Sequence, residues 1–271
     1  MITMKNIYIF FQILKHSIMS AMEYKLSFLT QIIFMIINNS FFVFIFYLFF
    51  LKFKTIWWIE FYEWTILFSL FAFLFSFLHL FVAGFSVISN NIREWKIDSF
   101  LLLPIYPLTS ILPSKFLVSA IWDLLTSIWI FYLVYIFSDI NILWVILLCF
   151  KVMFLSIFSS FIILWFMIFF HSLSFYLWSS DQLSRWAFEA ILWPSMYPPA
   201  IYESTFLKPL FMTILPVFYI VFLPFKLVSD FNILDFSILV FASIFSMFLW
   251  IFTFNRWLKK YESGNMMNTN L

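Results

Sequence analysis

Long apolar runs that carry few or no charges alternate along this chain with short charged segments. A helix needs about 20 apolar residues to cross the hydrocarbon core of a bilayer, which is about 30 Å thick. Runs of this kind predict six membrane-spanning helices, at residues 26–51, 62–89, 114–137, 142–170, 182–198 and 232–256. We therefore expect an all-α polytopic integral membrane protein that forms a single transmembrane domain over residues 1–271.

Prolines concentrate between the fourth predicted span and the last one. Six of them lie between Asp181 and Lys226, namely Pro194, Pro198, Pro199, Pro209, Pro216 and Pro224. Proline interrupts a helix, and irregular backbone at membrane depth is tolerated only where protein or a water-filled cavity satisfies its polar groups. The pattern predicts a short fifth span followed by an outer re-entrant, proline-rich region at residues 199–231.

The first 25 residues mix polar and apolar positions more evenly than the rest of the chain. Gln12, His16, Ser20 and Glu23 recur at spacings of four, four and three, which places them on one polar stripe of a helix. This periodicity predicts an interfacial helix over residues 1–25, with its apolar face against the bilayer. A solvated cap that leads into the first span is the alternative.

Lysine and arginine are unequally divided between the two ends of the predicted spans. With the N-terminus inside, the inner segments hold Lys5, Lys15, Lys25, Arg93, Lys96, Lys115, Arg185, Arg256, Lys259 and Lys260, and the outer segments hold Lys52, Lys54, Lys208 and Lys226. Cytoplasmic segments of membrane proteins carry the excess of these residues. We therefore expect both termini and the loop at residues 90–113 to face the cytoplasm.

Composition supports the membrane assignment. Apolar residues make up 65% of the chain and charged residues only 10%, whereas a soluble domain carries about 25% charged residues. The lipid bilayer is therefore the first partner to expect. A net charge of +2 gives little basis for binding nucleic acid, and Cys149, the single cysteine, excludes a disulfide within the chain.

Few residues are suited to catalysis or to holding a cofactor. The phosphate-binding loop of an ATPase needs glycines at fixed short spacing and a following lysine, and this chain contains only Gly84 and Gly264. The histidines, His16, His79 and His171, lie in separate segments and form no helical pair of metal ligands. We expect no metal site, no cofactor and no nucleotide hydrolysis by this chain alone.

Three ionisable residues, Asp123, Lys151 and Glu189, fall inside predicted spans, where a charge is costly and often functional. Each has a structural interpretation. Arg185 precedes Glu189 by one helical turn and can pair with it, Lys151 can extend toward the interface, and Asp123 lies near the end of its span. The functional alternative is a membrane enzyme that acts on lipid and uses Asp123 or Glu189 as its acid or base.

Residues 90–113 are a charged, proline-punctuated interruption between the second and third predicted spans. Pro104 and Pro107 end any helix that begins near Asn90, so we expect a rigid elbow before the third span. The charged residues of this loop do not form a single helical face, and an ordinary solvated loop is the alternative to a docking element.

The sequence of this loop resembles that of a known transporter family. Residues 92–108 read IREWKIDSFLLLPIYPL. They resemble the cytoplasmic loop of bacterial exporter permeases of the ABC-2 type, which reads Ile-Arg-x-Gly-x-Leu-Asp, an apolar run, a basic residue and Pro-x-x-Pro. The matching residues are Arg93, Asp98, Pro104 and Pro107.

The resemblance has two departures and extends over most of the chain. Trp95 stands where the family has glycine, and Leu103 stands where it has a basic residue. Later segments are similar to the proline pattern before the last span and to the basic tail of these permeases: Tyr197-Pro198, Ile214-Leu215-Pro216-Val217, Leu223-Pro224 and Lys260-Tyr261-Glu262-Ser263.

The resemblance implies a transport subunit in the inner membrane of a bacterium. Such a permease pairs with a second copy or a paralogue, and two separate ABC ATPase subunits dock beneath it. The loop then acts as a coupling helix, with Arg93, Glu94, Lys96 and Asp98 as contact charges and with Pro104 and Pro107 closing the element. The substrate stays open, and a membrane scaffold without a transport role is a further alternative.

Overall fold

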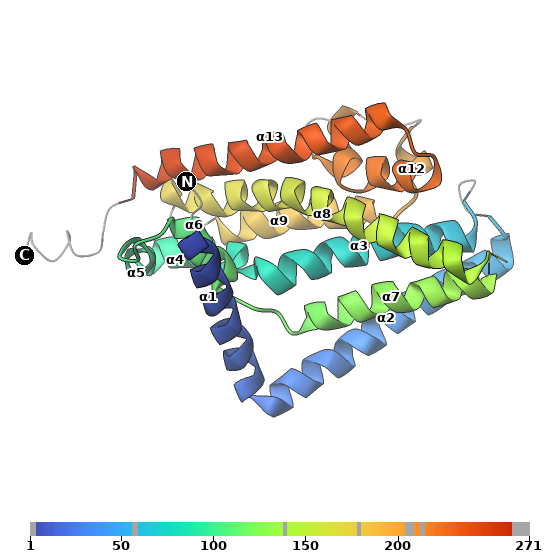
Figure 1. Cartoon of the computed structure of the whole chain (residues 1–271), viewed down its shortest axis with the longest axis horizontal. Coiled ribbons are helices and arrows are strands. Elements are labelled where there is room, and N and C mark those ends of the chain that lie inside the picture. The colour runs from blue at the N-terminus through green and yellow to red at the C-terminus, as the bar shows by residue number, and fades with distance from the viewer. Residues whose placement is uncertain are drawn as a thin grey trace, which may run out of the picture.

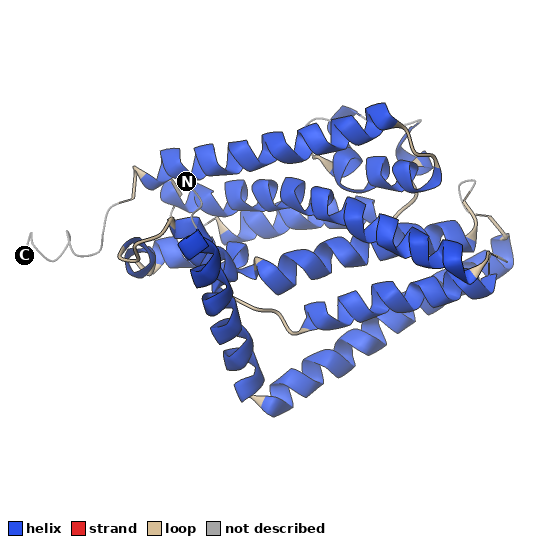
Figure 2. Cartoon of the chain, viewed as in Figure 1, coloured by secondary structure: helices blue, strands red, loops and turns tan. Residues whose placement is uncertain are grey.

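The computed structural model describes residues 4–55, 59–137, 140–177, 180–203, 209–211 and 215–261. The regular elements of these residues are helices, most of which lie side by side in one bundle (Figure 2). Residues 204–208 and 212–214 of the predicted re-entrant region, together with Glu262 and Ser263 of the tail motif, lie outside the described residues.

Five helices of the described chain are long and apolar enough to cross a bilayer. They are α2 (Lys25–Phe53), α3 (Phe61–Phe81), α7 (Ser119–Phe137), α8 (Ile142–Ser172) and α13 (Ile233–Leu258). The shortest, α7, has 19 residues, which corresponds to about 28 Å at the rise of an α-helix. The chain is therefore an all-α polytopic membrane protein, as its sequence predicts.

Helix α3 is the centre of the bundle. It packs against α7 and α8, and Trp64, Leu67, Leu70 and Leu74 are fully buried along its length. The Trp64 ring stacks on Phe46 of α2 with centroids 4.2 Å apart. Helices α2 and α13 lie at the outside and expose large apolar side chains, as expected where lipid replaces water as the solvent.

Helix α1 (Met4–Glu23) runs steeply across the direction of the bundle, and its first turn lies near α6 (Figure 1). Ser17 donates a hydrogen bond to the carbonyl of Pro113 at 2.8 Å, which attaches α1 to the end of the bundle. This transverse orientation fits an interfacial helix, because such a helix lies in the plane of the membrane.

Two predicted spans are shorter in the structure than their apolar runs. Helix α3 ends at Phe81 instead of continuing to residue 89, because the backbone leaves the α region at Val82 (φ −135°). Helix α7 begins at Ser119 instead of residue 114, because Pro113 lies in a 3-10 turn and Lys115 is extended. An apolar run alone does not show where its helix ends.

The short fifth span predicted at 182–198 is not among the five helices of the described chain that are long enough to cross a bilayer. Helix α9 (Asp181–Ser195) has 15 residues, or about 22 Å, which is less than the bilayer core. Pro194 lies in its last turn, and Pro198 and Pro199 follow soon after, which disfavours continuation of the helix. The following pieces are short: α10 (Ala200–Glu203), the π-helical η4 (Phe218–Phe222) and α12 (Leu223–Ser229).

Candidate functional site

The connecting segment, residues 82–118, joins α3 to α7 and folds into five short helical pieces. These are η1 (Ala83–Val87), α4 (Ile88–Arg93), α5 (Ile97–Leu101), α6 (Pro107–Ile111) and η2 (Leu112–Ser114). Pieces α4 to α6 gather at the end of the bundle where α1 begins and α13 ends, opposite α12 (Figure 1). The charged residues of the predicted coupling loop are thereby collected at one end of the molecule.

Trp95 makes the sharp turn between α4 and α5. Its φ is +59°, in the left-handed region that favours glycine. Glycine is the residue that the permease pattern places here, and the structure provides the physical reason. A tryptophan in this conformation carries backbone strain, and its indole ring lies 6.1 Å from the ring of Tyr261.

The two prolines of the loop have different roles. Helix α4 already ends at Arg93, and α5 ends at Leu101 before Pro104 is reached. Pro107 begins α6 at its first turn, where the missing N–H costs nothing. The elbow that the sequence predicts is therefore the bend at residues 102–106.

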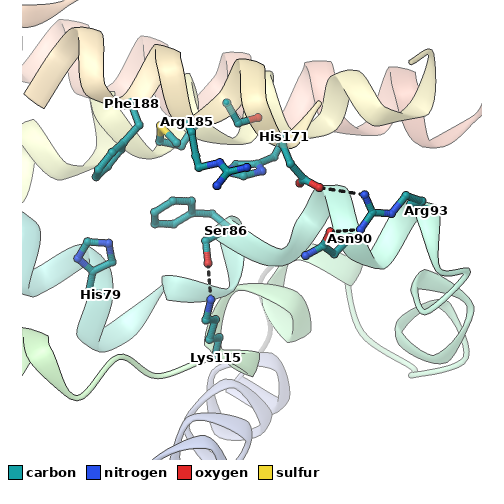
Figure 3. A pocket seen from close by; sticks show the side chains of 12 residues that line it. His79, Ser86, Asn90, Arg93, Lys115, His171, Arg185 and Phe188 are labelled. Atoms are coloured by element: carbon teal, nitrogen blue, oxygen red, sulfur yellow. Dashed lines mark hydrogen bonds and ion pairs between the residues drawn. The ribbon is translucent and has the colours of Figure 1, made fainter. Parts of the chain in front are cut away.

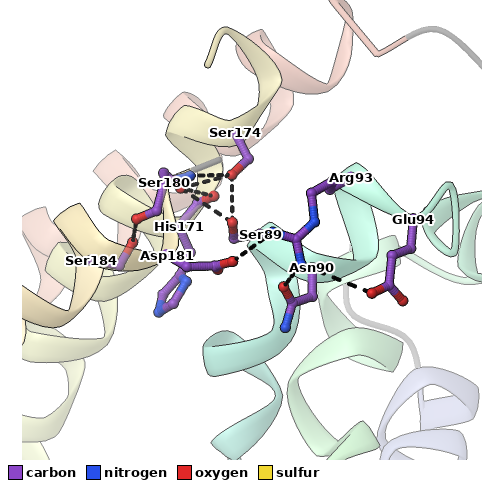
Figure 4. Close-up of polar contacts among 9 residues, drawn as sticks. All are labelled: Ser89, Asn90, Arg93, Glu94, His171, Ser174, Ser180, Asp181 and Ser184. Atoms are coloured by element: carbon purple, nitrogen blue, oxygen red, sulfur yellow. Dashed lines mark hydrogen bonds and ion pairs between the residues drawn. The ribbon is translucent and has the colours of Figure 1, made fainter. Parts of the chain in front are cut away.

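A polar network connects α4 to the junction between α8 and α9 (Figure 4). Arg93 donates to Asp181 at 3.2 Å and to Asn90 at 2.7 Å. Beside this pair, the hydroxyl of Ser174 contacts those of Ser89 at 2.5 Å and Ser180 at 2.8 Å. The predicted contact charge Arg93 thus makes an internal ion pair between elements that are far apart in sequence.

The connecting segment also contacts the end of α13. Tyr106 donates a hydrogen bond to Oδ1 of Asn255 at 2.8 Å, and burial raises the pKa of Tyr106 to about 12. Tyr261 follows α13 and packs against Trp95. Burial, and then the neighbouring Asp98 carboxylate, raise the pKa of Tyr261 above its usual value.

The outer surface of the segment combines charges with an apolar tip. Lys96 pairs with Glu94 at 2.6 Å, and both side chains are well exposed. The hydrogen bond from Lys96 is the main cause that lowers the pKa of Glu94. The bend after α5 presents Leu102, which is 86% exposed, between the partly exposed Leu101 and Leu103.

A pocket of about 510 Å³ lies behind this segment, between η1 and α4 on one side and α8 and α9 on the other (Figure 3). Its lining includes the cationic residues Arg93, Lys115 and Arg185 and the carboxylate of Asp181. Lys115 donates a hydrogen bond to Ser86 at 3.1 Å, and burial lowers its pKa. No group of three His, Cys, Asp or Glu side chains in the described ranges could hold a metal ion.

The intramembrane residues singled out from the sequence lie in separate places. Asp123, in the second turn of α7, accepts a hydrogen bond from Asn39 of α2 at 3.0 Å. Lys151 of α8 donates to the carbonyl of Val228 at 2.8 Å, at the carboxyl end of α12. Both residues therefore join helices.

The ion pair expected between Arg185 and Glu189 along α9 is not formed in the described structure. Glu189 is exposed, and the side chain of Arg185 lines the pocket instead (Figure 3).

Comparison with protein families gives a match to ABC-2 family transporter proteins over residues 33–264. This chain belongs to the ABC-2 transporter family. The match begins within α2 and includes the connecting segment and α13. Comparisons with curated proteins and with solved structures gave no match.

Membership of the ABC-2 family assigns this permease to membrane transport and implies association with an ABC ATPase. Several residues that position its connecting segment were not singled out from the sequence as site residues, among them Tyr106, Asn255 and Asp181. Tyr106 lies inside the family motif between Pro104 and Pro107, and its position there was the available signal. No signal in the sequence marked Asn255 or Asp181 as site residues, because their partners are distant in the chain.

Proposed function

We propose that this permease is the transmembrane subunit of an ATP-driven exporter in the bacterial inner membrane. It pairs with a second copy or a paralogue, and two separate ATPase subunits dock on its cytoplasmic end. Closure of the ATPases moves the helices and alternates access to a pathway between the two permeases. Family membership supports the transport role, and the excess of lysine and arginine at the end with the connecting segment supports the orientation.

The observation that carries the docking proposal is the surface of the connecting segment. The segment exposes the apolar side chain of Leu102 and, elsewhere on its surface, the charged pair Glu94 and Lys96, and this combination favours a protein-binding surface. Leu103 stands where the family pattern has a basic residue. We infer that the ATPase cleft that receives this segment has an apolar centre.

The contacts of the segment provide a route for movement. Arg93 connects α4 to Asp181 at the start of α9, and Tyr106 connects the bend to Asn255 near the end of α13. Since short helices packed in this way move as bodies, displacement of the segment would shift α9 and α13 together. These links, more than the exposed charges, would transmit the force of ATP binding.

Copurification tests the docking surface. The permease is expressed with its partner ABC ATPase, and the retained ATPase is measured with wild type, Leu102→Ser and Leu234→Ser. Leu234, 69% exposed at the start of α13, is the matched control at the opposite end. We expect Leu102→Ser to weaken ATPase binding about tenfold, as loss of a central interface side chain does, with the control unchanged. Equal retention by all three proteins would contradict the docking assignment.

A membrane enzyme acting on lipid is the competing class. The carboxylate of Asp123 accepts a hydrogen bond from Asn39, which joins α7 to α2. Glu189 lies on the exposed side of α9. These positions support structural and surface roles. Transport that survives in Asp123→Asn and Glu189→Gln would count against the enzyme, and its loss in vesicles that retain the ATPase would favour it.

A further inference from the structure

The pocket behind the connecting segment has an excess of positive charge. Arg93, Lys115 and Arg185 line it (Figure 3), and Asp181 is the one carboxylate among the described residues of its lining. Asp181 is engaged by Arg93 at 3.2 Å. The other two cations therefore have no carboxylate partner in the described part of the chain.

The remaining polar groups of the pocket favour an anion. Lys115 donates to a neutral partner, the hydroxyl of Ser86, and Arg185 lines the pocket and is exposed. His171, 6% exposed, lines the same pocket, and its Nδ1 has no hydrogen-bond partner. Buried polar atoms are normally paired, so this nitrogen and the two cations leave room for an anion in a pocket whose Asp181 carboxylate is paired with Arg93.

The lining of the pocket also includes apolar side chains. Phe85, Met167 and Phe188 line it together with the cations. In Figure 3, Phe188 and His79 lie toward the body of α3, and Arg93 and Asn90 lie toward the charged end of the molecule. The pocket therefore suits a ligand with one anionic end and one apolar end.

We propose that this pocket binds the phosphate head group of an anionic lipid from the cytoplasmic leaflet. The phosphate lies between Arg185 and Lys115, His171 contributes a ring nitrogen, and the lipid chain passes Phe188 toward the bilayer. Basic pockets between membrane helices on the cytoplasmic side bind such head groups. The proposal uses the orientation argued above and is independent of ATPase docking.

Lipid binding by the purified, detergent-solubilised permease tests the proposal. Native mass spectrometry and thermal unfolding are measured with added phosphatidylglycerol, phosphatidylcholine or inorganic phosphate. We expect phosphatidylglycerol to stay bound and to raise Tm, and the other two to do neither. Arg185→Gln should weaken phosphatidylglycerol binding about tenfold, the loss expected for one charge-assisted hydrogen bond.

The control variants distinguish lipid binding in the pocket from general electrostatic attraction of the lipid to the protein surface. Lys259→Gln removes an exposed cation just beyond α13 and should leave lipid binding unchanged, whereas Lys115→Gln should weaken it. Arg185 is exposed, so its variant keeps the fold even if the Lys115 variant does not. Equal binding of phosphatidylcholine, protection by inorganic phosphate alone, or unchanged binding by Arg185→Gln would each overturn the proposal. ATPase copurification is measured separately, so failure here is distinguishable from failure of docking.

Discussion

The hydroxyl of Tyr106 donates a hydrogen bond to Oδ1 of Asn255 at 2.8 Å, across 149 positions of sequence. The bond joins the bend of the connecting segment to the last long helix. Because one partner lies in the family motif and the other near the end of α13, a variant that removes this contact tests the proposed coupling of the segment to the bundle most directly.

Tyr106→Phe removes this bond and leaves the ring in place. We expect ATP turnover to continue while transport per ATP falls several-fold, with a loss of unfolding free energy of about 0.5–1.5 kcal/mol. Transport and ATPase activity are measured in the same vesicles. Tyr132→Phe, at an exposed position of α7, is the control and should change neither. A normal transport-to-ATP ratio in Tyr106→Phe would remove this bond from the coupling route.

Arg93 and Asp181 provide a charge-exchange test. Both side chains are partly exposed, so the pair contributes no more than about 1 kcal/mol to stability. Arg93→Asp and Asp181→Arg should each lower transport, because each places like charges together, and the double variant should restore part of it. A double variant that is no better than its parents would show that Arg93 acts elsewhere, for example directly on the ATPase.

Trp95→Gly separates backbone strain from the ring contact with Tyr261. Glycine removes the left-handed strain, which raises the free energy of unfolding by about 1 kcal/mol. It also removes the aromatic contact, which lowers the free energy of unfolding by about 0.5–1.5 kcal/mol. Thermal unfolding should therefore change little. Tyr261→Leu loses the contact without relieving strain and should be the less stable of the two. The reverse order would mean that the turn at Trp95 is unstrained.

Gly84→Ala tests the packing of η1 against α6 and η2. A methyl group at this position would overlap the carbonyl oxygen of Ile111 and lie 2.6 Å from that of Leu112. Overpacking against backbone costs about 1–3 kcal/mol, and we expect a lower Tm with impaired transport. Val87→Ala, in the same 3-10 helix, is the comparison and should be milder. Equal Tm values for Gly84→Ala and Val87→Ala would show that η1 separates easily from α6 and η2.

Much of the architecture was predictable because a bilayer imposes a simple rule on sequence. Apolar runs of more than about 20 residues must be helical to satisfy their backbone in lipid, and α2, α8 and α13 lie over the spans expected at 26–51, 142–170 and 232–256. The charged loop and its family resemblance were also readable, since Arg93, Asp98, Pro104 and Pro107 are neighbours in the chain.

Only the tertiary structure shows the contacts between residues that are far apart in sequence. The partners of Arg93 and Tyr106 come from other helices, and no local pattern encodes such a contact. The short length of α9, the early end of α3 and the positive φ at Trp95 depend on packing and on backbone sterics that hydropathy does not measure. Sequence alone identified the membrane class, the family and the charged loop, because composition and periodicity are local. Only the fold showed that this loop is connected to α9 and α13 and stands in front of a basic pocket.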